Sequence, residues 1–165
     1  MKDRIWAPWR GEYIIEANKP RGSCFLCDLA RAKLSQENLL VHSTEHSYVV
    51  LNKFPYNNGH IMIVPKKHAE NFNGLTEVEY RDLCDLLKLS LNVLNKVYNP
   101  QGCNVGINLG KVAGAGIDDH IHYHIVPRWN GDTNFMQIFT VVKVISEHIA
   151  TTYDKIFKGF TEVSK

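Results

Sequence analysis

The most regular alternation of polar and apolar residues falls at residues 120–126, where three histidines alternate with isoleucine and tyrosine. Side chains two residues apart share one face of an extended strand. His120, His122 and His124 are therefore predicted to stand in a row on one face, with the apolar residues on the other. Neighbours in such a row lie roughly 6.6 Å apart, and the outer two lie roughly 13 Å apart. One metal ion cannot bind all three, so the pattern predicts different roles for them.

Other apolar runs predict the rest of the fold. Short runs bounded by turn-forming residues predict strands at 39–41, 48–51, 61–64 and 104–109. A longer run has leucine and valine at helical spacing and predicts a helix over 77–98. Thr76 and Glu79 have the spacing of a capping box at its start. Further helices are predicted over 28–34 and 141–157.

The order of these elements is strands, helix, strands, helix, with short connections between sequential strands. This order indicates the α+β class with a mainly antiparallel sheet rather than repeated βαβ units. The 165 residues, 44% of them apolar, are enough for one domain with its own core. We expect an irregular N-terminal arm at 1–23, packed by its aromatic residues, a core at 24–129, and an extension with a helix at 130–165.

Composition narrows the functional classes. A formal net charge of +2 is too small to indicate a nucleic-acid binder on electrostatic grounds. No run approaches 18 apolar residues, so we expect no membrane span. The first residues lack the continuous apolar stretch of a secretory signal, which favours the cytoplasm.

Two of the four cysteines, Cys24 and Cys27, form a C-x-x-C pair. In a reducing compartment this spacing indicates a metal site or a redox pair rather than a structural disulfide. Two histidines could complete a closed structural zinc site, and His68 and His120 are the candidates. Inert thiols and a redox-active pair remain the alternatives.

The histidine row suggests chemistry at phosphorus. A neutral imidazole is a competent nucleophile, and its attack on phosphorus gives a phosphoramidate that a second nucleophile can open. His124 could donate to a phosphate oxygen or orient its neighbour. The glycine-rich segment before the row could bind phosphate oxygens through the backbone N–H groups of Lys111 to Gly116, which include Gly114 and Ala115.

A catalytic zinc is the competing interpretation of the same row, because His-x-His on a strand is a familiar ligand pair. No acidic general base stands at an obvious spacing, although Asp118 and Asp119 directly precede the row. Outside the row the polar candidates are Asn52, Asn58, His60 and Asn108. Asn108 lies between Gly106 and Gly110 at the end of the predicted strand, where it could bind ribose or phosphate, whereas Asn57 and Asn58 are typical turn residues.

From Cys24 to Trp129 the chain resembles the histidine triad (HIT) family of nucleotidyl hydrolases and transferases. Residues 120–126 match the family motif His-φ-His-φ-His-φ-φ, in which φ is apolar. Residues 58–68, NGHIMIVPKKH, are similar to its Gly-His-φ-φ-φ-φ-Pro-Lys-x-His segment. The resemblance implies a HIT-like fold, with a five-stranded antiparallel sheet, two main helices and a homodimer whose sheets join.

The resemblance also implies roles for individual residues. The middle histidine, here His122, would be the nucleophile of a covalent nucleotidyl intermediate, and His124 would assist through phosphate contact and proton handling. Family members with a C-x-x-C bind zinc through residues that match Cys24, Cys27, His68 and His120 of this chain.

One departure is informative. The usual hydrolases of the family carry Ala-Gly-Gln-Ser/Thr before the triad, whereas residues 113–119 read AGAGIDD, with no glutamine. Together with residues 52–59 and 126–135, this segment resembles the branch that contains diadenosine tetraphosphate phosphorylases (ATP adenylyltransferases).

We therefore expect an enzyme that cleaves an adenine dinucleoside polyphosphate, with inorganic phosphate as the acceptor and ATP and ADP as products. Gly114 to Gly116, Asn108 and His124 would hold the phosphates, and Asn52 the nucleoside. The alternatives are a hydrolase of dinucleoside polyphosphates or nucleoside phosphoramidates, and a nucleotide-binding regulatory protein with negligible turnover.

Overall fold

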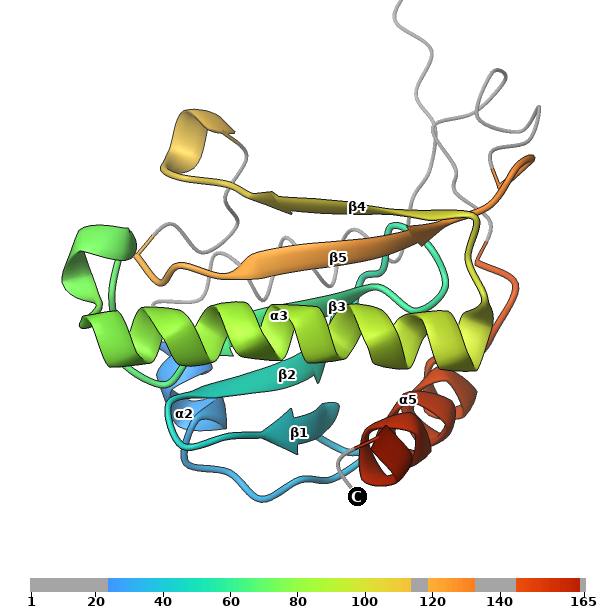
Figure 1. The fold of residues 1–165 in the computed structure, drawn as a ribbon, viewed down its shortest axis with the longest axis horizontal. Coiled ribbons are helices and arrows are strands. Elements are labelled where there is room, and N and C mark those ends of the chain that lie inside the picture. Colours follow the sequence, from blue (N-terminus) through green and yellow to red (C-terminus); the bar gives the residue numbers. More distant parts are fainter. Residues whose placement is uncertain (1–23, 114–118, 133–144, 164–165) are drawn as a thin grey trace, which may run out of the picture.

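The computed structural model describes residues 24–113, 119–132 and 145–163. A single antiparallel sheet runs through these residues in the order β1-β2-β3-β5-β4 (Figure 1). Its strands are β1 (Leu40–Ser43), β2 (Ser47–Leu51), β3 (Ile61–Pro65), β4 (Gly102–Ile107) and β5 (Tyr123–Arg128). The predicted α+β fold with a five-stranded antiparallel sheet is confirmed.

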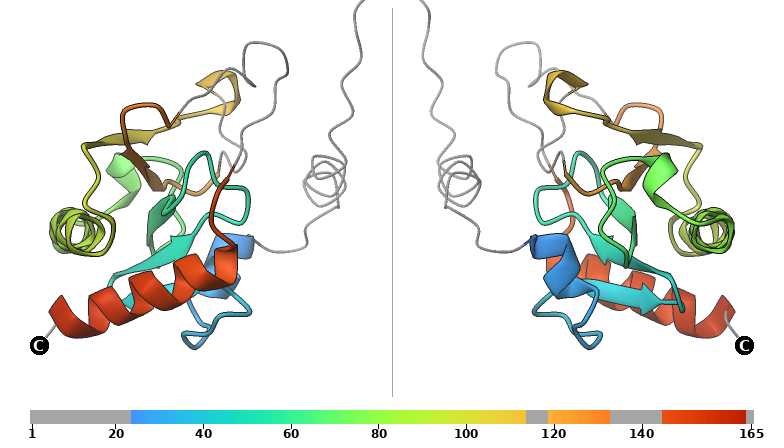
Figure 2. Two further views of the ribbon diagram at one scale, coloured as in Figure 1. Left: turned by 90° about the vertical axis from the view of Figure 1, so that its right-hand side faces the viewer. Right: turned by 90° about the vertical axis from the view of Figure 1, so that its left-hand side faces the viewer.

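Helices cover both faces of this sheet (Figure 2). The long helices α3 (Glu77–Tyr98) and α5 (Ile149–Val163) pack on one face, where their apolar side chains meet Val49, Ile61 and Ile63. The short helix α2 (Phe25–Leu29) packs on the other face. Because neighbouring strand residues point to opposite faces, Val49 faces the long helices while Tyr48 and Val50 face α2. Two 3-10 turns complete the described elements, η1 (Phe72–Gly74) and η2 (Lys111–Ala113).

Helix α3 begins and ends where the sequence predicts. The Thr76 hydroxyl accepts a hydrogen bond from the Glu79 N–H, and the Glu79 carboxylate accepts one from the Thr76 N–H at 2.7 Å. This reciprocal pair is the predicted capping box. At the other end Asn99 adopts the left-handed conformation, with φ of 43°, which stops the helix.

Among the described residues, no helix is both long and apolar enough to cross a membrane.

The predicted boundaries of two helices are wrong. Helix α2 starts at Phe25, with Cys24 as its N-cap, and ends at Leu29 instead of spanning 28–34. The C-terminal helix starts at Ile149, because residues 145–148 are not helical; residues 141–144 lie outside the described residues. Near the end of this helix a Cβ on Gly159 would lie 2.6 Å from the Val97 side chain, so α5 and α3 are closely packed there.

The histidine row also differs from its prediction. Strand β5 begins at Tyr123, where pairing with Ile63 of β3 starts, so of the three histidines only His124 lies in a strand. The two preceding histidines lie in a segment that bonds to the chain beyond β3 instead of to a neighbouring strand. In that segment, the Ile121 N–H donates to the Ala69 carbonyl at 2.7 Å. The three side chains therefore do not form one evenly spaced row.

Candidate functional site

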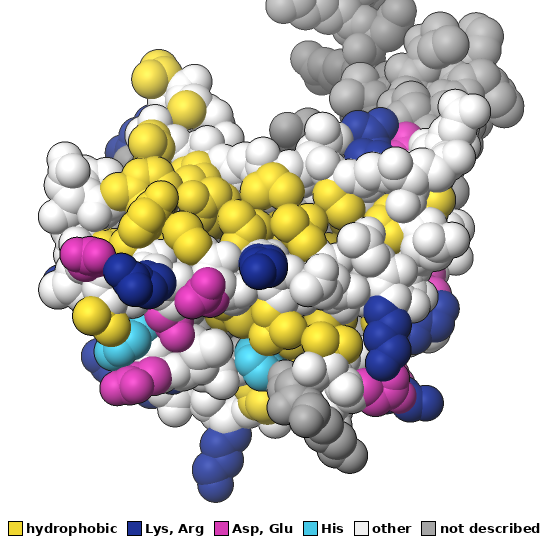
Figure 3. Space-filling view, viewed as in Figure 1, with side chains coloured by type: hydrophobic (Ala, Val, Ile, Leu, Met, Phe, Trp, Pro, Cys, Tyr) yellow, Lys and Arg dark blue, Asp and Glu magenta, His cyan; other side chains and the backbone are white. Residues whose placement is uncertain are grey.

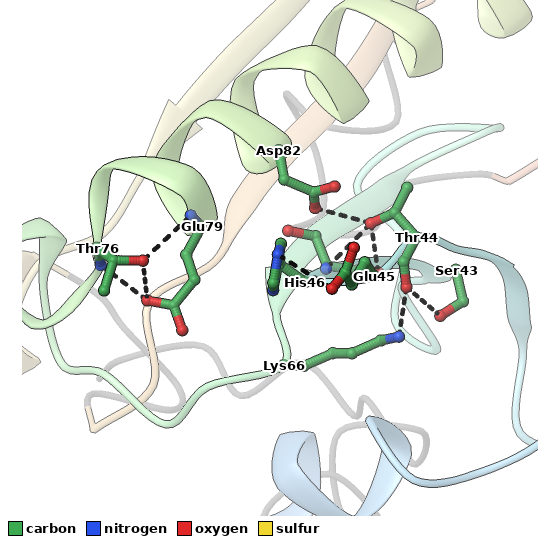
Figure 4. Close-up of polar contacts among 9 residues, drawn as sticks. Ser43, Thr44, Glu45, His46, Lys66, Thr76, Glu79 and Asp82 are labelled. Carbon is green, nitrogen blue, oxygen red and sulfur yellow. Dashed lines mark hydrogen bonds and ion pairs between the residues drawn. The ribbon is translucent and has the colours of Figure 1, made fainter.

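The site lies where β3 ends and β5 begins. The chain that leaves β3 is held in place by the turn between β1 and β2 (Figure 4). The Lys66 N–H donates to the His46 carbonyl at 2.7 Å, and the Lys66 ammonium donates to the Thr44 carbonyl. The Thr44 hydroxyl in turn donates to the Asp82 carboxylate of α3 at 2.7 Å. This anchoring fixes the segment that carries His68.

A group of two thiols and two imidazoles forms beside this segment. Its ligand atoms belong to Cys24, Cys27, His68 and His120, and all lie within 4.8 Å of one another. The Cys24 Sγ lies 3.3 Å from the His120 Nδ1, and the Cys27 Sγ lies 3.4 Å from the His68 Nδ1. The structure thus brings together the four residues that the sequence predicts as metal ligands.

The geometry of this group fits a tetrahedral ion. Bond lengths of about 2.3 Å to sulfur and 2.0 Å to nitrogen place the ligand atoms of a tetrahedral zinc roughly 3.5 Å apart. The His120 Nε2–H donates to the Pro65 carbonyl at 2.9 Å, so its Nδ1 keeps a lone pair that faces both thiols. Burial and the neighbouring Cys24 raise the pKa of the Cys27 thiol to about 11. A divalent ion bound here would displace that proton.

His122 is held in one tautomer by the backbone. Its Nδ1 lies 2.8 Å from the His120 carbonyl oxygen, which can only accept, so Nδ1 carries the proton. Burial lowers the pKa of the ring, so His122 is neutral near pH 7. The Nε2 of a neutral ring protonated at Nδ1 carries a lone pair, which is the form that attacks an electrophile.

His124 is held in the opposite tautomer through His60. The Tyr56 N–H donates to the His60 Nδ1 at 3.0 Å, so a neutral His60 carries its proton on Nε2. That proton points to the His124 Nδ1 at 2.9 Å. His124 must then carry its own proton on Nε2, where it can donate a hydrogen bond to a ligand. Since the ring centroids of His122 and His124 are 4.9 Å apart, a nitrogen lone pair and an N–H donor lie side by side.

Burial keeps His60 and His124 uncharged. It lowers the pKa of His60 to about 3 and that of His124 to about 4, with further lowering by the neighbouring histidines. His60 itself is 1% exposed and both its ring nitrogens face protein atoms. The sequence suggests a nucleotide contact for His60, but its position behind His124 gives it a supporting place instead.

Of the remaining predicted nucleotide-binding residues, the structure describes Asn52 and Asn108. The Asn52 side chain accepts from the Phe54 N–H at 2.9 Å. It also lies 3.5 Å from the His60 Nε2, so Asn52 lies beside the ring that supports His124. Asn108 follows β4 directly, and the last pair between β4 and β5 joins Ile107 to Tyr123, the sequence neighbours of Asn108 and His122. Gly114, Ala115 and Gly116 lie outside the described residues, as does the N-terminal arm.

Two residues that hold the site together are not apparent from the sequence pattern. Asn57, a turn residue by its context, is buried and donates to the Pro127 carbonyl at 2.9 Å and to the Asp132 carboxylate at 2.8 Å. Asp132 also pairs with Arg128 through two bonds of 2.6 and 2.9 Å. In the sequence both residues lie in polar loops, and this does not predict the contact between Asn57 and Asp132.

The lowered pKa values predict a loss of stability in acid. Both folded-state pKa values lie below the unfolded value of about 6.5, so the unfolded chain binds more protons between pH 6.5 and 4. The contribution is fully present above pH 6.5 and is lost as the pH falls. For His60 alone we expect the free energy of unfolding to drop by about 2 kcal/mol between pH 6.5 and 4.5.

Chemical denaturation at both pH values measures this drop, and His60→Asn is the matched variant. Carboxylates titrate in both proteins, so the difference between them isolates the histidine. An equal drop in the two proteins would contradict the assignment of a buried neutral imidazole at His60.

Comparisons with known proteins agree with this geometry. The sequence profile described as the HIT domain matches residues 33–131. The chain is 37% identical over 155 residues to a Mycobacterium tuberculosis protein named AP-4-A phosphorylase, covering 90% of this chain and 80% of the relative. It is 30% identical over 108 residues to an adenosine 5'-monophosphoramidase of Schizosaccharomyces pombe, covering 66% of this chain and 76% of the relative.

Among solved structures, a hypothetical histidine triad nucleotide-binding protein from Sulfolobus tokodaii superimposes with a TM-score of 0.66 at 28% identity. The match covers 85% of this chain and 91% of that protein. The sheet order and helix placement described above therefore recur in a related protein.

Proposed function

The chain belongs to the HIT domain family of nucleotide-processing enzymes, and from this membership and the histidine geometry we propose that it transfers adenylyl groups from dinucleoside polyphosphates. The proposed substrate is diadenosine tetraphosphate, with inorganic phosphate as the acceptor and ATP and ADP as products. The first half of the reaction forms a covalent adenylate on His122.

The hydrogen bond from the His122 Nδ1 to the His120 carbonyl carries this proposal. It leaves the Nε2 lone pair free to form an N–P bond at the α-phosphorus. As that bond forms, the bond from phosphorus to the bridging oxygen breaks, and its electron pair leaves with ATP. Attack by a phosphate oxygen then forms ADP and returns the N–P electron pair to Nε2.

His124 supports the departure of the leaving group. With its proton on Nε2, it can donate a hydrogen bond to a phosphate oxygen, where negative charge develops. A polyphosphate is stable as an anion at neutral pH, so a hydrogen bond is enough and no full proton transfer is needed. The neutral state of His124, a consequence of burial, suits such a leaving group.

The choice of phosphate as acceptor rests on the relative from Mycobacterium tuberculosis and on the sequence before the triad. That relative, named AP-4-A phosphorylase, matches this chain over 80% of its own length. The absence of glutamine from residues 113–119 of this chain is a second argument, because that glutamine accompanies the usual hydrolases.

Product analysis tests the reaction. Diadenosine tetraphosphate is supplied with and without inorganic phosphate, and nucleotides are resolved by ion-exchange chromatography. We expect ATP and ADP to appear only when phosphate is present. AMP and ATP formed regardless of phosphate would identify a hydrolase, and tight binding without turnover would identify a regulatory binding protein.

We also propose that Cys24, Cys27, His68 and His120 hold a structural zinc ion. Four protein ligands leave no open coordination position, so such an ion would link distant chain segments and would not activate water. It would join α2, the segment after β3 and the segment before β5. The support is the match between the observed ligand spacing and a tetrahedral site.

A homodimer formed through β4 is the proposed assembly. Among the described residues this edge strand pairs only with β5, and it exposes Val105. Hydrophobic side chains gather in a band between β4 and α3 (Figure 3), and Leu109 and Val112 beyond the strand are exposed as well. An unpaired edge beside an apolar band is a template for pairing with a second copy.

Sedimentation equilibrium measures the assembly. We expect twice the mass of one chain for the native protein and a shift toward one chain for Val105→Lys, since a charge on an edge strand opposes pairing. Leu34→Lys is the control, because Leu34 is similarly exposed but precedes β1 at the opposite edge of the sheet. A native protein with the mass of a single chain would refute the dimer.

A further inference from the structure

We propose that Tyr56 is a further substrate-binding residue, whose hydroxyl donates a hydrogen bond to the polyphosphate part of the leaving group. The inference rests on the proposed adenylyl transfer at His122 and extends it to the opposite end of the site. Tyr56 is 58% exposed, although its ring contacts the buried His60.

The aromatic rings of the site are ordered in space. His122 contacts His124 at 4.9 Å between ring centroids, and His124 contacts His60 at 5.1 Å. The Tyr56 ring lies 4.7 Å from His60 and 6.1 Å from His124, inclined by 29° to the latter. Among the described residues no ring contact joins Tyr56 to His122. Tyr56 therefore lies beyond His124 as seen from the nucleophile.

The base of this side chain is fixed. The Tyr56 N–H is bonded to the His60 ring, and the next residue, Asn57, is 6% exposed and bonded to Asp132 and Pro127. The backbone therefore has little freedom, while the side chain projects outward. Its hydroxyl has no hydrogen-bond partner among the described residues. A donor held in place and left without a partner is suited to bind a ligand.

The path of the leaving group connects these observations. Attack by the His122 Nε2 requires the bridging oxygen to depart on the side of the phosphorus opposite the forming bond. His124 donates to that departing end, so the rest of the polyphosphate continues past His124. Consecutive phosphorus atoms lie about 3 Å apart, and the 6.1 Å between the two ring centroids is spanned by two phosphates. We therefore expect the hydroxyl on this ring to meet phosphate oxygens rather than the adenine at the end of the chain.

The two half-reactions separate this role from a structural one. Only the first half-reaction contains the leaving group, so Tyr56→Phe should slow formation of the adenylate and not its decay. Rapid quenching with diadenosine tetraphosphate gives the rate of adenylation. Decay of the adenylate on addition of inorganic phosphate, after excess substrate is removed, gives the second rate; there a phosphate oxygen attacks phosphorus, ADP is released and the N–P electron pair returns to Nε2.

We expect adenylation by Tyr56→Phe to be slower by about 10-fold at subsaturating substrate, as for a lost hydrogen bond to a charged group, with an unchanged decay rate. Tyr80→Phe, which removes a hydroxyl from an exposed ring on α3, is the control. Equal rates for Tyr56→Phe and the native protein, or an equal slowing of both steps, would overturn the inference. A native protein that forms no adenylate would refute the proposed function itself, so the two failures are distinguishable.

Discussion

His122→Asn is expected to form no covalent adenylate and to lose roughly 10³-fold or more in turnover of diadenosine tetraphosphate. Asparagine can keep the hydrogen bond that His122 donates to the His120 carbonyl, because its amide N–H stands close to the position of Nδ1. It offers no nitrogen lone pair to phosphorus. The substitution therefore removes the nucleophile while it disturbs the surrounding packing least.

The adduct is detected by mass spectrometry of the intact chain after quenching with radiolabelled or unlabelled substrate. His46→Ala is the matched control, since His46 lies in the turn between β1 and β2, its side chain pairs with the neighbouring Glu45 at 3.8 Å, and the substitution keeps the backbone carbonyl that accepts from Lys66. We expect that variant to label and turn over like the native protein. Labelling of His122→Asn to the native level would exclude His122 as the nucleophile.

Removal of the metal ligands is expected to have the largest effect on stability. The double variant Cys24→Ser/Cys27→Ser should lose bound zinc and about 3–5 kcal/mol of unfolding free energy, because the link between three chain segments is then broken. The reason is specific to this fold. Helix α2 has only five residues and depends on tertiary contacts for its stability.

Metal content is measured by atomic emission on purified protein and stability by chemical denaturation. Cys84→Ser supplies the control, since Cys84 lies on α3 outside the proposed ligand group. We expect it to retain one zinc per chain. Full zinc in the double variant, or unfolding indistinguishable from that of Cys84→Ser, would show that the thiols hold no structural ion.

The same experiment bears on catalysis through His120. Its ring faces the two thiols, while its carbonyl accepts the Nδ1 proton of His122. A change at the proposed zinc ligands can therefore alter the position of His122 through His120 alone. We expect the double variant to form the adenylate more slowly than the native protein, measured as the labelling rate of the folded fraction.

Much of the fold could be predicted from local sequence. Helix α3 was defined by leucine spacing and by a capping box that involves only neighbouring residues, and the structure has the same boundaries. The strands β1 to β4 follow the predicted apolar runs to within about two residues. The boundaries of α2 and α5 differ from the prediction, and Leu26 and Gly159 of these helices pack against residues distant in sequence, which local spacing does not reveal.

The sequence by itself determined which residues are the candidates for the chemistry. Alternation singled out His120, His122 and His124, and the C-x-x-C spacing singled out Cys24 and Cys27, because residue type and short spacing are local properties. It also predicted that one ion could not bind all three histidines, and the structure is consistent with this, since His120 alone of the three lies in the metal group.

Only the tertiary structure decided what each ring can do. A tautomer depends on the atom that faces each nitrogen, and those atoms come from the Pro65 carbonyl, the His120 carbonyl and the Tyr56 N–H. The chain folds back so that His60 meets His124, 64 residues away, and Asn57 meets Asp132, 75 residues away. Hydrogen bonds over such separations depend on the sheet order, which places β3 beside β5. The local sequence pattern does not indicate which strands are neighbours in the sheet.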